Sequence, residues 1–167
     1  IELINFDLNQ INLAPIFDDV MEQTLKSCNV PYAFIQIINP QNTLPLVKAK
    51  KGFDGKVSYN YSIANRLTDN DNFFQVEDIT TEKAFEDKTS PLASNQIHFY
   101  ASAPIISVKG DLLGHLIIMD TEAKLLDDIQ ISFLNLLAKN AAVQFELVKK
   151  NDQFDRILEI YALISET

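Results

Sequence analysis

The sequence predicts an α+β domain in which two β-hairpins lie between an opening helix and a closing helix. The first observation behind this prediction is the spacing of apolar residues at intervals of three and four over 13–28 and again from residue 127 onward. The second is two strand-like pairs of apolar runs, over 32–51 and 97–119, each interrupted by turn residues. A length of 167 residues suits one domain with one hydrophobic core.

The opening helix is predicted over residues 13–28, with Asn12 as the N-cap and Pro15 in the first turn. Residues 32–38 are rich in aromatic and β-branched side chains, which favour a strand. Residues 44–51 alternate lysines with apolar residues and predict the second strand of a hairpin.

The stretch over 54–95 is the least periodic part of the chain, so we expect an irregular fold there. Within it, residues 73–76 predict a short strand ending at Asp78, and residues 80–85 predict a short helix. Long loops in compact domains often cover or line a functional site, and a surface excursion without function is the alternative.

The clearest hairpin in the sequence spans residues 97–119, with its turn at 109–111. Its second strand is apolar on both alternating faces over 116–119. We therefore expect this strand to lie centrally in a sheet that is covered on both sides.

The closing helix is predicted to begin after Asp127, the N-cap of a capping box with Gln130. The stripe expected to face the core consists of Ile129, Phe133, Leu136, Leu137, Ala141 and Phe145. Further residues have coiled-coil spacing: Leu147, Lys150, Phe154, Ile157, Tyr161 and Ile164. This second stripe covers about two and a half heptads and is interrupted by Lys150, so it predicts a marginal helix pairing through Leu147, Phe154, Ile157 and Tyr161.

Residues of the second hairpin resemble a pattern of the GAF domain family. In many bacterial members it reads Phe-Tyr-Ala-Gly-Ala-Pro-Leu, a glycine turn, and then Leu-Gly-x-Leu-x-Val-x-Asp. The matching residues here are Phe99-Tyr100-Ala101-Ser102-Ala103-Pro104-Ile105, Gly110, and Leu113-Gly114-His115-Leu116-Ile117-Ile118-Met119-Asp120. Residues 74–78 resemble the family's short strand that ends in Asp, and the resemblance covers roughly residues 13–148.

This resemblance implies a profilin-like, PAS-related fold with a central antiparallel sheet of about six strands. The terminal helices are expected on one face of that sheet and the irregular middle segment on the other. We expect a GAF-like domain over residues 1–148, continued over 149–167 by the closing helix as a signalling coiled coil.

The same resemblance implies a non-catalytic sensory domain of a signal-transduction protein, which binds a small molecule between the middle segment and the sheet. Members of the family often dimerise through their terminal helices, so a homodimer is expected. A kinase, cyclase or transcription-control module is the expected fused or associated partner. The competing hypothesis is a dimerisation module with no bound ligand.

Composition and charge exclude several other classes of protein. Apolar residues make up 47% and charged residues 22%, which argues against disorder and low complexity. Fourteen Lys and Arg against 23 Asp and Glu give a net charge of −9, which repels phosphate backbones and anionic lipid. We therefore expect no nucleic acid and no membrane among the partners.

The sequence also favours a cytoplasmic location. Its single cysteine, Cys28, cannot form an internal disulfide, and its apolar runs are far shorter than the roughly 20 residues of a membrane helix. The amino terminus lacks a signal-peptide pattern. Because the chain begins at Ile1 rather than at methionine, we expect it to be trimmed or to be an excised domain.

Patterns of the common enzyme and metal classes are missing from the sequence. Four glycines allow neither a Walker loop nor a dinucleotide fingerprint, and no Gly-x-Ser-x-Gly elbow occurs. Two histidines and one cysteine cannot build a closed zinc site from nitrogen and sulfur ligands. Within the family, bilin attachment and thiol-relay reduction of methionine sulfoxide need cysteines that the chain lacks. We expect no catalysis and no metal; cyclic nucleotides stay open, and no cofactor is identified.

The candidate ligand-binding residues are Phe73, Phe74, Asp78, Phe85, His98, Tyr100 and Ser102. His98 shares a strand face with Tyr100 and Ser102, where it is either a switchable contact or axial haem ligand, or a partly exposed strand-end residue. The aromatic residues either wall a pocket or close the core without a cavity. Asp78 either caps a turn or contacts a ligand. His115 and Cys28 are expected to be packing residues.

Overall fold

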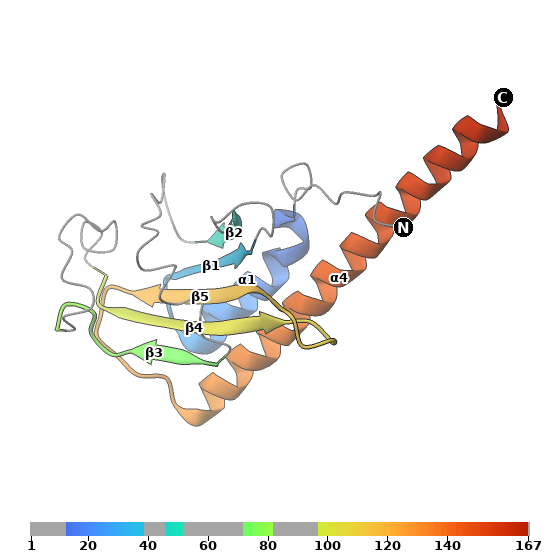
Figure 1. Ribbon diagram of the computed structural model, residues 1–167. Coiled ribbons are helices and arrows are strands. Elements are labelled where there is room, and N and C mark those ends of the chain that lie inside the picture. Colours follow the sequence, from blue (N-terminus) through green and yellow to red (C-terminus); the bar gives the residue numbers. More distant parts are fainter. Residues whose placement is uncertain (1–12, 39–45, 52–71, 82–96, 167) are drawn as a thin grey trace.

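The computed structural model describes residues 13–38, 46–51, 72–81 and 97–166 (Figure 1). The elements along the chain are α1 (Ala14–Cys28), β1 (Tyr32–Ile37), β2 (Leu46–Lys51), β3 (Phe74–Val76), β4 (Phe99–Ile106), β5 (Leu112–Asp120) and α4 (Asp128–Ser165). This order agrees with the predicted succession of helix, hairpin, short strand, hairpin and long helix. Residues 80–81 lie in a turn, and the rest of the short helix predicted over 80–85 lies outside the described residues.

The strands form one antiparallel sheet in the order β2-β1-β5-β4-β3. Both predicted hairpins are present, since β1 pairs with β2 and β4 pairs with β5. The strand β5 lies in the centre, which confirms the position that its apolar sequence predicted. The described part of the chain has five strands, so a sheet of about six is not confirmed.

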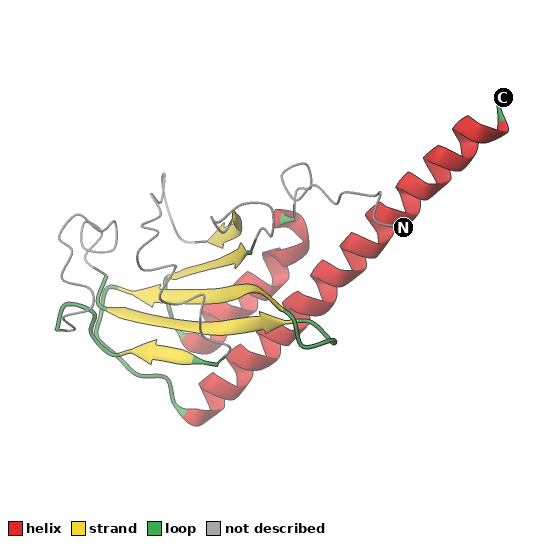
Figure 2. Cartoon of the chain, viewed as in Figure 1, coloured by secondary structure: helices red, strands yellow, loops and turns green. Residues whose placement is uncertain are grey.

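The helices α1 and α4 lie side by side on one face of the sheet (Figures 1 and 2). The helix α1 packs against β1 and β2, and α4 packs against β4 and β5. The two helices also pack against each other, which places the core between one helical layer and one sheet layer. None of the helices in the described part of the chain has the length and apolar character needed to cross a bilayer.

The helix α1 follows its predicted apolar stripe. Phe17, Val20 and Met21 are buried, and Pro15 stands in the first turn, where its missing N–H costs nothing. The N-cap position is held by Leu13 without a side-chain hydrogen bond, one residue after the predicted Asn12, which lies outside the described residues. The helix ends at Asn29, whose left-handed φ of 50° suits an asparagine.

The start of α4 confirms the predicted capping box. The Asp127 carboxylate accepts the backbone N–H of Gln130 at 2.8 Å, and the Gln130 side-chain oxygen accepts the N–H of Asp127 at 3.1 Å. The Gln130 amide also donates to the carbonyl oxygen of Ser27 at 3.3 Å, which joins the start of α4 to the last turn of α1.

The core-facing stripe predicted for α4 is partly wrong. The residues that enter the core are Leu134, Leu137, Ala138, Ala141, Ala142 and Phe145. Ile129 and Leu136 are instead 80% and 58% exposed, and Phe133 is partly exposed. The helix has two apolar stripes, and the one rich in alanine faces inward because small side chains let a helix approach a sheet and a neighbouring helix closely.

Candidate functional site

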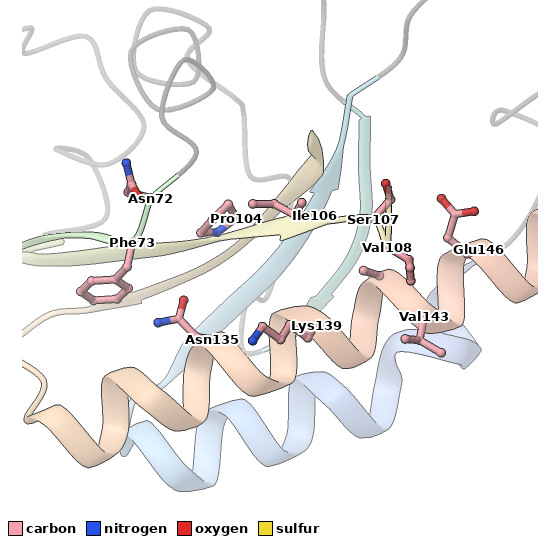
Figure 3. A pocket seen from close by; sticks show the side chains of 11 residues that line it. Asn72, Phe73, Pro104, Ile106, Ser107, Val108, Asn135, Lys139, Val143 and Glu146 are labelled. Atoms are coloured by element: carbon pink, nitrogen blue, oxygen red, sulfur yellow. The ribbon is translucent and has the colours of Figure 1, made fainter. Parts of the chain in front are cut away.

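Strand pleating directs the side chains of the sheet alternately to its two faces. Figure 3 shows Phe73, which precedes β3, directed toward α4, so its neighbour Phe74 points away from the helices. The register places Phe74 opposite Ser102, which lies opposite Ile117, and Tyr100 follows on the same face. The sheet face opposite the helices therefore carries Phe74, Tyr100 and Ser102.

These residues differ in their burial. Tyr100 and Ser102 are almost fully buried, and Phe74 is half-buried against the core. Phe73 and Phe74 do not form one wall, because adjacent strand residues point to opposite faces. Phe85 lies outside the described residues. The role of this group in holding a ligand stays a prediction.

Two buried polar residues lie at the centre of the same face. Gln36 of β1 is directly opposite His115 of β5, and both side chains are fully buried. His115 was expected as a packing residue, whereas Gln36 was not among the predicted site residues. Its signal in the sequence is a single carboxamide inside the aromatic and β-branched run over 32–38. Together with Tyr100 and Ser102, these residues bring hydrogen-bonding groups to an otherwise apolar surface.

Asp78 caps the turn that follows β3, as one of its two predicted roles requires. Its carboxylate accepts the backbone N–H of Thr80 at 3.0 Å and the Thr80 hydroxyl at 2.6 Å. The same oxygen lies 3.1 Å from Nδ1 of His98. The hydrogen bonds from Thr80, assisted by His98, lower the pKa of Asp78 below its ordinary value of 3.8.

We expect Asp78→Asn to make the stability of the protein decrease less steeply as the pH is lowered into the acid range. A carboxylate whose pKa is lowered by folding contributes stability above its unfolded pKa of 3.8, and this contribution disappears as the pH falls through the lower folded value. Thermal melts from neutral pH to below 3.8 should show a steep wild-type curve and a shallower variant curve. Thr80→Val, which removes the hydroxyl but keeps the carboxylate, should give an intermediate slope. Parallel curves for all three proteins would contradict this assignment.

The connection between β5 and α4, residues 121–127, joins the sheet to the start of the long helix. Lys124 extends its ammonium group to Asp120 at 2.6 Å and to the carbonyl oxygen of Asn29 at 2.7 Å. Its backbone N–H donates to the carbonyl oxygen of Glu77 at 3.2 Å. The Gln75 side chain accepts the N–H of Leu126 at 2.9 Å. The end of β3 and the end of α1 are therefore both tied to the residues that begin α4.

A groove of about 880 Å³ lies between α4 and the sheet, near the start of β3 and the end of β4 (Figure 3). Its apolar lining includes Phe73, Val108 and Val143, and Lys139 and Glu146 of α4 border it. The groove is bounded by α4, by Phe73 and by Pro104 and Ile106 at the end of β4, and neither Tyr100 nor Ser102 is among its lining residues. The sequence-based site did not include it, because its lining residues come together only when α4 packs on the sheet.

Cys28 has the packing role that its position predicted. The thiol is buried at the end of α1, and burial raises its pKa to about 11. At neutral pH the side chain is therefore a protonated thiol and a poor nucleophile.

The chain matches the sequence profile of one known domain family. The sequence profile of the GAF domain matches residues 12–145. No curated protein matches the chain significantly.

The fold is similar to those of several solved structures. The GAF domain of a phosphoenolpyruvate-protein phosphotransferase from Coxiella burnetii superposes with a TM-score of 0.72 at 18% identity, covering 87% of this chain and 89% of that one. The blue-light absorbing form of the Thermosynechococcus elongatus PixJ GAF domain gives 0.70 at 15% identity, with 87% and 91% covered. A domain assigned to a two-component sensor histidine kinase from Sinorhizobium meliloti gives 0.63 at 12% identity, with 89% and 98% covered.

Proposed function

Because the chain belongs to the GAF domain family, we propose that it is a non-catalytic sensory domain of a signal-transduction protein. It binds a small molecule on the sheet face opposite the helices and signals through paired terminal helices. The observation that carries this proposal is the course of α4, a single helix of 38 residues that packs in the core and continues beyond the sheet (Figure 1). Such a helix is a rigid element that can carry a change in the domain to a following module.

The sheet face opposite the helices, called the ligand face below, has suitable chemistry for binding a small molecule with polar and apolar parts. Phe34 and Ile117 form an apolar floor, and Ser102, Gln36 and His115 add hydrogen-bonding groups within it. Small-molecule sites typically combine an apolar lining with a few polar groups that fix the orientation of the ligand.

The connection over 121–127 offers a route from this face to α4. Asp78, in the turn after β3, contacts His98, and both residues lie beside the ligand face. The same turn begins at Glu77, whose carbonyl oxygen accepts the backbone N–H of Lys124. Gln75 holds the N–H of Leu126, the residue before the helix cap. A ligand that displaces β3 or its turn changes these contacts and shifts the start of α4.

A neighbouring signalling module and a cytoplasmic location complete the proposal. The similar structures come from a phosphotransferase and from a protein assigned as a sensor histidine kinase, which supports a role beside a kinase, cyclase or transcription-control module. The net charge of −9 favours neither nucleic acid nor an anionic membrane surface as a partner.

A thermal-shift titration tests ligand binding. We expect at least one compound from a panel of cyclic nucleotides, amino acids and haem to raise the melting temperature, because a ligand selective for the native state stabilises it. Ser102→Leu fills the ligand face and should abolish the shift. Asn135→Leu, a change of similar character on the helix side of the sheet, should preserve it. A crystal structure with a solidly packed interior and no room for a ligand would refute ligand binding.

The second candidate function is a dimerisation module without a ligand. It is favoured by the exposed apolar residues near the carboxyl end of α4, where Phe154 is 61% and Tyr161 is 73% exposed, with Leu147 and Ile157 also exposed. Phe154→Asp should convert a dimer to a monomer in sedimentation experiments, since a charge would be placed in an apolar interface. A dimer that responds to no compound of the panel would favour this second function over the first.

A further inference from the structure

The groove beside α4 has two walls of different chemistry (Figure 3). On the helix, the lining positions 135, 139, 143 and 146 are three or four residues apart, so they share one side of α4 over about 16 Å. The facing wall comes from the start of β3, from β4 and from the turn that follows β4. Its apolar members are Phe73, Pro104, Ile106 and Val108. The groove is therefore long and narrow, with an apolar side toward the sheet.

The helix wall carries two opposite charges. Lys139 and Glu146 both border the groove, and seven residues of helix place their Cα atoms about 10.5 Å apart along the axis. Ala142 and Val143, between them, are apolar. Lys139 is exposed and Glu146 partly exposed, and no ion pair joins either of them to another residue in the described part of the chain. Both charges are thus available to a molecule that lies in the groove.

The strand β4 continues past its neighbour at this place. The short strand β3 pairs with residues 100–102 of β4, whereas Pro104 and Ile106 lie farther along β4 and line the groove. No strand among the described residues pairs with this side of β4 beyond Ser102. An unpaired strand edge offers backbone hydrogen-bonding groups to an extended chain.

We propose that this groove binds a short peptide of about three residues with free termini and apolar side chains. The carboxylate of the peptide lies at Lys139 and its ammonium group at Glu146. Three extended residues span about 10 Å, which matches the separation of the two charges on the helix. The apolar side chains of the peptide pack on Phe73, Ile106 and Val108.

Other small molecules satisfy this groove less well. An apolar monocarboxylate pairs with Lys139 but places its tail against the Glu146 carboxylate, whose desolvation is costly. A free amino acid has both charges on one carbon atom and cannot reach both residues. A multiply charged anion meets Glu146 and a chain with a net charge of −9.

This site is separate from the ligand face and goes beyond the proposed function. Neither Tyr100 nor Ser102 lines the groove. Because one wall is α4 itself, a bound peptide contacts the long helix directly and is a second input to it.

Isothermal titration calorimetry of the 167-residue chain with trileucine tests the proposal. Trileucine should bind, and triglycine should bind about 30-fold or more weakly, because it has no side chains to bury. Trileucine with an amidated carboxyl end and trileucine with an acetylated amino end should each bind about fivefold more weakly, since each loses one ion pair.

Substitutions assign each end of the peptide to its residue. Lys139→Met and Glu146→Gln should each weaken trileucine about fivefold. Lys139→Met should cause no further loss for the amidated peptide but the full loss for the acetylated one, and Glu146→Gln should do the reverse. Lys150→Met and Glu159→Gln, the same changes at exposed positions of α4 outside the groove, should leave the affinity within about twofold. Melting curves show that each variant is folded.

The possible outcomes separate this site from the ligand face. Ser102→Leu, which fills the ligand face, should leave trileucine binding unchanged, and its loss there would place the peptide on that face and refute the groove. Absence of trileucine binding at the highest concentration that dissolves also refutes the proposal. Equal affinity for the free and capped peptides, or for the wild-type chain and both charge variants, shows that the two charges do not hold the peptide and overturns the assignment.

Discussion

Replacing Gly114 by alanine is expected to destabilise the protein by about 3 kcal/mol or more, a large fraction of the stability of an ordinary domain. Gly114 lies in β5, opposite Ile37 of β1. A Cβ atom at this position would clash with the carbonyl oxygen of Gln36 and would lie 3.0 Å from Cα of Ile37. Both contacts are with backbone, so relief of the clash requires β1 to move away from the central strand of the sheet.

The matched control for this substitution is Gly110→Ala in the β4–β5 turn. Nothing lies within 4 Å of a Cβ added there, and the cost comes only from the φ of 92°, which is unfavourable for an L side chain. We expect this strain to cost about 1 to 2 kcal/mol. Urea unfolding of both variants measures the difference. Equal destabilisation by the two alanines would show that the close approach of β1 and β5 is not what requires glycine at position 114.

Lys124→Met is expected to have the second largest effect, through the connection between the sheet and α4. The substitution removes the ammonium group that lies 2.6 Å from Asp120 and 2.7 Å from the carbonyl oxygen of Asn29. It leaves the Asp120 carboxylate, only 9% exposed, without its counter-charge. We expect a loss of about 1 to 3 kcal/mol, less than for a fully buried pair because the lysine is partly exposed. Hydrogen exchange of the first turn of α4 should accelerate.

Two controls isolate the cause of this loss. Lys26→Met makes the same change at an exposed pair, where Lys26 lies 3.0 Å from Glu22, and should cost about 0.5 kcal/mol or less. The double variant Lys124→Met with Asp120→Asn removes the uncompensated charge and should recover part of the stability. If the two methionine variants unfold at the same urea concentration, or if the double variant is no better than the single one, the buried ion pair is not the source of the effect.

The features that could be predicted from the sequence are those with local signals. The capping box of Asp127 and Gln130 involves residues only three positions apart. The β4–β5 hairpin was predicted from the turn residues around Gly110, whose φ is 92°. The central place of β5 follows from its apolar character on both faces, because only a strand covered on both sides can bury such a sequence.

The candidate site was predictable only in part. Tyr100 and Ser102 were placed on one face by strand alternation alone, and the register agrees. The separation of Phe73 from Phe74 also follows from alternation, but the start of so short a strand could not be located within a polar stretch. Gln36 was missed because its partner across the sheet, His115, is 79 residues away and their pairing depends on the register of β1 with β5.

By itself, the sequence determined which segments become helices and strands and where α4 begins, because these depend on residues close together in the chain, and the resemblance of the second hairpin to the GAF family indicated the fold. Only the tertiary structure decided which of the two apolar stripes of α4 enters the core, since both satisfy helical periodicity and the choice depends on how closely the helix can pack on the sheet. Likewise, the ties of Lys124 join residues up to 95 positions apart, and such contacts form only when the chain has folded.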